Sequence, residues 1–159
     1  MIRVLPLLFS LLLLALPIAA NAHHGFTGRY DLSAPIWIEG VVTQAYFGRP
    51  HATLTLRTAS DMALPARRPD PANAKETIVV ERLGIRKDTI GREIVIEFPP
   101  VSQFFELGSS VAVGSRVSVI AFRNCDAPHQ LRGQWILTDK PGAQPVARAG
   151  RSSYQVERC

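Results

Sequence analysis

Short segments rich in β-branched and aromatic residues, separated by Pro and Gly, constrain the fold of this chain more than any other feature. Residues 36–46 have no helical period, and alternate residues such as Ile36 and Ile38 fall on one face of a strand. Further segments that predict strands are residues 51–58, 77–83, 93–98, 116–123 and 131–138. The pattern indicates an all-β protein.

One short helix and one glycine refine this expectation. Ser102 can cap a helical turn through Leu107 that Gly108 ends. Gly40, in the middle of the first strand, indicates a bulge or bend of the kind that small barrels need. About six short strands with one helix predict an OB-like barrel, because closure removes the sheet edges; a β-sandwich is the alternative. The expected core contains Ile38, Leu54, Leu56, Ile96, Val117 and Val119.

Residues 1–22 have the parts of a cleavable export signal. Arg3 gives a weakly positive start, residues 4–18 are almost entirely apolar, and Ala20-Asn21-Ala22 is a small-x-small cleavage pattern. The apolar run is shorter than the roughly 20 residues that a membrane span needs, so a signal fits better than an anchor. We expect cleavage after Ala22, a mature chain that starts at His23, and a periplasmic or secreted protein with no membrane segment.

The mature chain is expected to form a single β-barrel domain at residues 23–139 and an extended tail at residues 140–159. Residues 59–76 contain three prolines and no periodicity, which predicts a mobile loop. The 18 Lys and Arg exceed the 13 Asp and Glu, but the basic residues are scattered, which favours a solvated surface. Cys125 and Cys159 are expected to form a disulfide in an oxidising compartment.

The mature start, HHGFTGRYD, and the following IWIEGVVTQAYFGRPHATL resemble a family of small exported bacterial proteins of unknown function. Its members typically open His-His-Ser-Phe, reach Tyr-Asp or Phe-Asp, continue with a strand like EGTVT, and place Asn-Pro-His before the second strand. The matching residues are His23, His24, Phe26, Tyr30, Asp31, Glu39, Gly40, Val42, Thr43, Pro50 and His51. Gly25 and Arg49 stand where Ser and Asn are usual. The resemblance implies export and a small OB-like barrel, and it brings no established activity.

A processed N-terminal histidine predicts a copper site. The α-amine and ring Nδ1 of His23 can chelate a metal, and one more imidazole would complete a T-shaped set of three nitrogens, a histidine brace. Such ligands favour Cu(II), and an α-amine with a pKa near 8 loses its proton readily to a metal. His51 is the best candidate for the second imidazole, because it lies at a turn-to-strand junction after a proline.

Other residues could complete the same site. His24 is a rival of His51, since an amine, the next amide and a second-position imidazole also bind Cu(II). His129, in the loop after Cys125, is a third candidate. Asp31, Asp126 or Tyr30 could fill an axial position or support a ligand. Such a site would carry, sense or use copper in redox chemistry.

Catalysis has thinner support in the sequence. No GxSxG nucleophile motif occurs, and Glu39, Glu93 and Glu97 are expected to point outward from strands and not to form an acid–base pair. A polysaccharide-cleaving copper enzyme would need a broad aromatic face. The obvious contributors are Trp37, Tyr46, Phe47 and Trp135, although Trp135 is expected in the core.

The alternative is a metal-free periplasmic binding module for an anionic glycan or a partner protein. Export argues against nucleic acid as its ligand. An OB-like face could hold such an anionic oligomer. The basic residues expected on that face are Arg49, Arg57, Arg116 and Arg132.

Overall fold

The computed structural model describes residues 28–159, so His23, His24 and the expected cleavage site lie outside the described part. The strands are β1 Tyr30–Asp31, β2 Ile36–Tyr46, β3 Thr53–Thr58, β4 Glu93–Glu97, β5 Arg116–Arg123, β6 Leu131–Thr138, β7 Val146–Ala147 and β8 Gln155–Val156. Within residues 28–159 the helices are the α-helix α2 Ser102–Phe105 and the 3-10 helices η2 Ala72–Ala74, η3 Val80–Arg82, η4 Lys87–Thr89 and η5 Glu106–Ser109. No helix in this part is long and apolar enough to cross a membrane.

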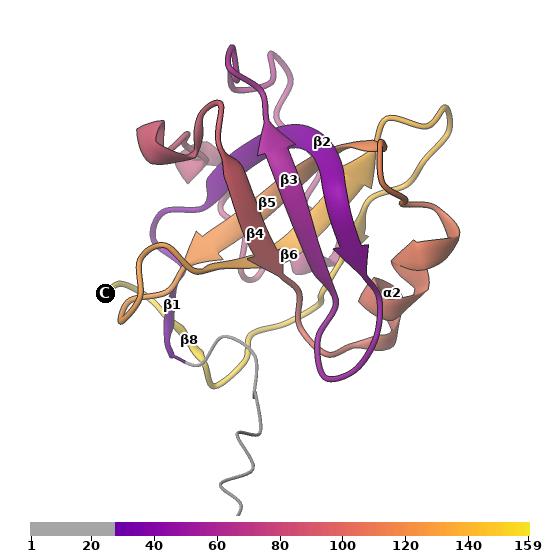
Figure 1. The fold of residues 1–159 in the computed structure, drawn as a ribbon. Helices are drawn as coiled ribbons and strands as arrows, with labels where there is room; N and C mark the ends of the chain where they lie inside the picture. Colours follow the sequence, from indigo (N-terminus) through magenta and orange to yellow (C-terminus); the bar gives the residue numbers. More distant parts are fainter. Residues whose placement is uncertain (1–27) are drawn as a thin grey trace, which may run out of the picture.

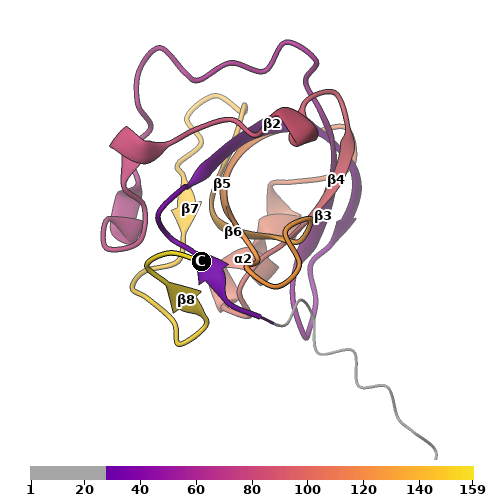
Figure 2. The same ribbon diagram turned by 90° about the vertical axis from the view of Figure 1, so that its left-hand side faces the viewer.

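Five of the strands close into a ring (Figures 1 and 2). β2, β3 and β4 are successive antiparallel neighbours, β5 pairs with the other edge of β2, and β6 pairs with β5. β4 then pairs in parallel with β6, through Ile96 with Leu131 and Glu97 with Arg132. The predicted all-β, OB-like barrel is confirmed, because one sheet returns on itself where a sandwich would have two.

The strand pattern read from the sequence holds for most of the barrel. β2, β5 and β6 have the predicted bounds, and β3 alternates buried Leu54 and Leu56 with more exposed residues. The six residues expected in the core are all fully or almost fully buried and belong to one cluster. α2 and η5 lie at one end of the barrel, where Phe104 and Leu107 join that cluster.

Residues 77–83 were expected to form a strand, and this prediction was wrong. The segment contains η3 and crosses a second apolar cluster, where Ile78 and Leu83 are buried with Trp37. Its link to the sheet is the adjacent Gly84, whose carbonyl accepts a hydrogen bond from the Trp37 N–H (2.8 Å). The apolar residues of this segment serve here to cover apolar surface, and beside β2 the chain makes a single bridge, between Ile36 and Gly84.

Two local expectations are also corrected. The bulge of β2 lies between Val42 and Gln44, not at Gly40. A Cβ at Gly40 would lie 2.6 Å from the Arg57 carbonyl oxygen, so this glycine permits close approach of β3. Ser102 is the first residue of α2 and makes no side-chain cap, and Gly108 lies within η5.

The C-terminal segment packs beside the barrel. β7 pairs with β6, and β8 pairs in parallel with β1. Cys125 and Cys159 lie at disulfide distance, with their Cα atoms 5.4 Å apart. Figure 2 shows β1, β8 and the chain end together at one side of the ring. This arrangement places the tail beside the start of the described chain.

Candidate functional site

His51 lies in the turn between β2 and β3, on a well-supported piece of backbone. The Tyr46 hydroxyl donates to the carbonyl of Arg49 (2.5 Å), which holds the turn from one side. The Phe98 N–H donates to the carbonyl of Ala52 (2.8 Å), which ties the following residue to the end of β4. The His51 side chain is therefore presented by a braced turn, with 18% of its surface exposed.

Three further side chains extend from His51 across the end of the barrel. The Oε1 atom of Glu97 lies 3.8 Å from His51 Nδ1 and 2.6 Å from Arg132 Nη2. The Arg132 guanidinium carbon lies 4.9 Å from the centre of the Tyr30 ring, in a cation–π arrangement. We call His51, Glu97, Arg132 and Tyr30 the His51 cluster.

The barrel topology assembles this cluster. Glu97 ends β4 and is the register partner of Thr53 on one side and of Arg132 on the other. His51 precedes β3 by two residues, and so lies beside the same end of β4. Tyr30 belongs to β1 and also bridges to Asn124, just after β5. Four elements distant in the sequence thus meet where the ring closes.

Burial controls the charge of the histidine. It lowers the pKa of His51 below its ordinary value, Glu97 works in the opposite direction, and Arg132 lowers the pKa further. The imidazole is therefore neutral at pH 7. Its Nδ1 atom is buried and has no hydrogen-bond partner among residues 28–159. Burial has the opposite effect on Tyr30, whose pKa it raises above its ordinary value, although Arg132 acts to lower that pKa.

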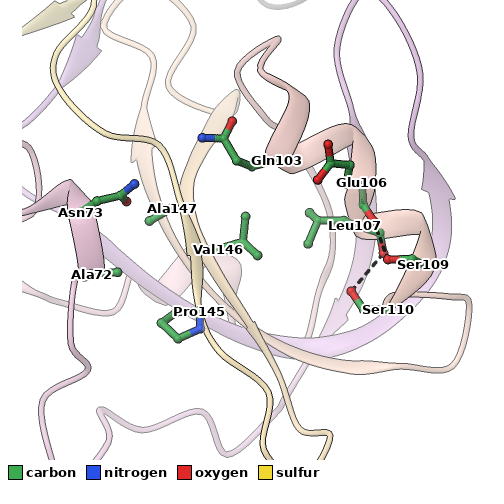
Figure 3. Close-up of a pocket in the computed structure, with 10 residues that line it drawn as sticks. All are labelled: Ala72, Asn73, Gln103, Glu106, Leu107, Ser109, Ser110, Pro145, Val146 and Ala147. Atoms are coloured by element: carbon green, nitrogen blue, oxygen red, sulfur yellow. Dashed lines mark hydrogen bonds between the residues drawn. The ribbon is translucent and has the colours of Figure 1, made fainter.

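A pocket of about 380 Å³ opens beside the cluster. His51, Arg132 and Tyr30 form part of its wall, the turn at 99–101 forms another part, and tail residues between 148 and 155 close it. A larger pocket of about 470 Å³ lies between η2, η5 and β7 (Figure 3). Glu106 is the one titratable residue among those that line it in the described chain. Of these two pockets, the one at the His51 cluster therefore has more titratable side chains in its wall.

The remaining candidate ligands lie in different places. His23 and His24 are outside the described residues. His129 is exposed in the β5–β6 loop and does not line the pocket. Asp126 is exposed beside Arg29. Within residues 28–159 no three His, Cys, Asp or Glu side chains gather as a metal site.

Asp31 is buried in an ion pair with Arg123, at 3.0 Å. Burial alone would raise its pKa, but hydrogen bonds from Ser33 and Arg123 outweigh burial and hold the pKa below its ordinary value. Asp31 thus anchors β1, and its carboxylate is already occupied by protein partners.

One expectation about a surface residue was wrong. Glu97 was expected to be exposed, and it is 2% exposed because it lies against Arg132 where the ring closes. Trp37, named as a contributor to any aromatic substrate face, is buried against Trp135, with ring centres 6.0 Å apart. Trp135 is in the core as expected.

Two of the four arginines expected on one binding face lie at opposite ends of β4. Arg57 pairs in register with Glu93 at the start of β4, whereas Arg132 pairs with Glu97 at its end. Strand spacing places these two arginines about 13 Å apart along the sheet. Glu97 is the candidate site residue that sequence reasoning missed, and its position directly before Phe98-Pro99-Pro100, at a strand end, was the available signal.

Comparison with known proteins gives a family but no activity. Residues 11–101 match the model of a family described as "Family of unknown function (DUF6152)". The matched range includes His51 and Glu97 and stops before Arg132. No curated protein and no solved structure matches the chain.

Proposed function

The chain belongs to this family of unknown function, and we propose that after export it binds Cu(II) through the α-amine and ring of an N-terminal His23 and the ring of His51. The observation that carries the proposal is the environment of the His51 side chain. Its imidazole is held neutral by burial, it borders a pocket, and its buried Nδ1 lacks a hydrogen-bond partner among residues 28–159. A neutral imidazole is the form that binds a metal.

Glu97 supports the histidine in this role. Metal-bound histidines commonly donate their second ring N–H to a carboxylate, which sets the tautomer. Glu97 Oε1 is 3.8 Å from His51 Nδ1, so a movement of about 0.8 Å would form that hydrogen bond. A proton on Nδ1 leaves Nε2 as the metal ligand.

The N-terminus starts close enough to take part. Gly28 lies against Asn124, because a Cβ at Gly28 would be 2.4 Å from the side-chain oxygen of Asn124. Asn124 bridges to Tyr30, a member of the His51 cluster. His23 lies five positions before Gly28, and a backbone of that length can span up to about 17 Å. That length allows the amine of His23 to reach the pocket.

The test is Cu(II) affinity of the exported protein, measured by competition with a chelator of known affinity. N-terminal sequencing should first read His-His-Gly-Phe. His51→Ala should weaken binding more than tenfold, or about 1.4 kcal/mol. One Ala inserted before His23 should weaken it at least as much, because the amine then leaves the chelating residue.

Two histidine variants serve as controls. His129→Ala should leave the affinity unchanged, since His129 is exposed outside the pocket. His24→Ala should have little effect. If His24→Ala abolishes binding while His51→Ala does not, the metal is held by the terminus alone and the proposal is wrong.

A further inference from the structure

We propose that the pocket beside the His51 cluster binds a small organic carboxylate with an apolar body, with or without metal. This inference goes beyond the copper site and rests chiefly on Arg148 and the C-terminal tail, although His51 lines the same pocket. The pocket volume of about 380 Å³ lies within the range of about 300–1,000 Å³ that is typical of small-molecule sites.

The charge of the pocket wall indicates an anionic ligand. Arg132 and Arg148 line the pocket, and none of its lining residues in the described chain is a carboxylate. Glu97 balances the charge of Arg132. Arg148 has no ion-pair partner among residues 28–159, and one of its nitrogens donates to the carbonyl of Gly150 (3.2 Å). Arg148 thus brings a positive charge that a ligand carboxylate can pair with, in the two-pronged geometry that guanidinium favours.

Buried amides hold Arg148 in place. The backbone N–H of Arg148 donates to the Gln134 carbonyl (3.0 Å), and the Gln134 side chain donates back to the Arg148 carbonyl (2.9 Å). Gln155 donates to the Gln134 side chain (3.2 Å) and accepts from the Ser152 N–H (2.9 Å). Gln134 is fully buried and Gln155 is 8% exposed. This closed network fixes the wall before any ligand arrives, which lowers the entropic cost of binding.

Part of the wall is apolar. Pro99, Pro100 and Val101 line the pocket, and so does Tyr154, which is 64% exposed. Prolines and an exposed tyrosine ring offer apolar surface to an aromatic or aliphatic body. A wall that combines arginines with apolar side chains matches an acid that carries a ring.

The experiment titrates the metal-free exported protein with benzoate and follows ¹H–¹⁵N NMR shifts. Benzamide is the matched probe without charge, and acetate is the matched probe without a ring. Benzoate should bind saturably and shift the amide signals of Val101 and of residues 148–155, while benzamide and acetate should bind at least tenfold more weakly. Equal affinity for benzamide, or no saturable shift with benzoate, would overturn the proposal.

Variants of the tail locate the site. Arg148→Gln should weaken benzoate at least tenfold, whereas Arg148→Lys should weaken it less because it keeps the charge. Arg151→Gln is the control, since Arg151 pairs with Glu157 in the same tail and does not line the pocket. An unchanged affinity in Arg148→Gln would refute the assignment; if that variant fails to fold, the benzoate–benzamide comparison on the unmodified protein decides. Because no metal is present, failure here leaves the copper proposal standing.

Discussion

Glu97 and Arg132 form a buried ion pair where the ring closes. Removal of one partner should show how much this pair contributes to stability and to the pKa of His51. In Arg132→Met, the Glu97 carboxylate, whose side chain is 3% exposed, loses a cation 2.6 Å away. Leaving a buried charge without its partner typically costs about 3–5 kcal/mol. We expect a loss of this size in the free energy of unfolding at pH 7, measured by urea denaturation.

The double variant Glu97→Met/Arg132→Met separates the ion pair from simple packing. It removes both charges of the pair, so it should recover much of the stability that Arg132→Met loses. The pKa of His51, followed by NMR, should rise in Arg132→Met, because the neighbouring positive charge that lowers it is gone and Glu97 remains. If the double variant is as unstable as Arg132→Met, or if the pKa of His51 falls, the electrostatic reasoning is wrong.

Three further predictions concern stability. Leu54→Ala should cost about 2–5 kcal/mol because Leu54 is fully buried, whereas Leu64→Ala, at a side chain 37% exposed, should change stability by no more than about 0.5 kcal/mol in urea denaturation. Replacing Cys125 and Cys159 by Ser should cost about 3–4 kcal/mol, given their separation of 34 residues; equal stability of the reduced and oxidised proteins would contradict this. Because the folded-state pKa of Asp31 is lowered, its carboxylate stabilises the fold at pH values above its unfolded pKa of about 4. This stabilisation is lost as the pH falls through the folded-state pKa. Asp31→Asn should therefore make the free energy of unfolding less dependent on pH in that range.

The sequence alone determined the strands that make the barrel. β2, β5 and β6 were predicted with their bounds, because alternation and turn residues are local signals that need no knowledge of the partner strand. The pairing of Cys125 with Cys159 followed from their being two in number. His51 could be singled out because it stands at a turn after a proline.

Only the tertiary structure decided what surrounds His51. Glu97 has the alternation of an outward strand residue, yet it is buried, because the parallel pairing of β4 with β6 brings Arg132 against it. That contact joins residues 35 positions apart and depends on ring closure, which no local pattern encodes. The same holds for Arg148, which the tail carries to the pocket through pairing with Gln134. Local sequence sets which segments extend, but burial and charge at a site depend on which distant segments meet there.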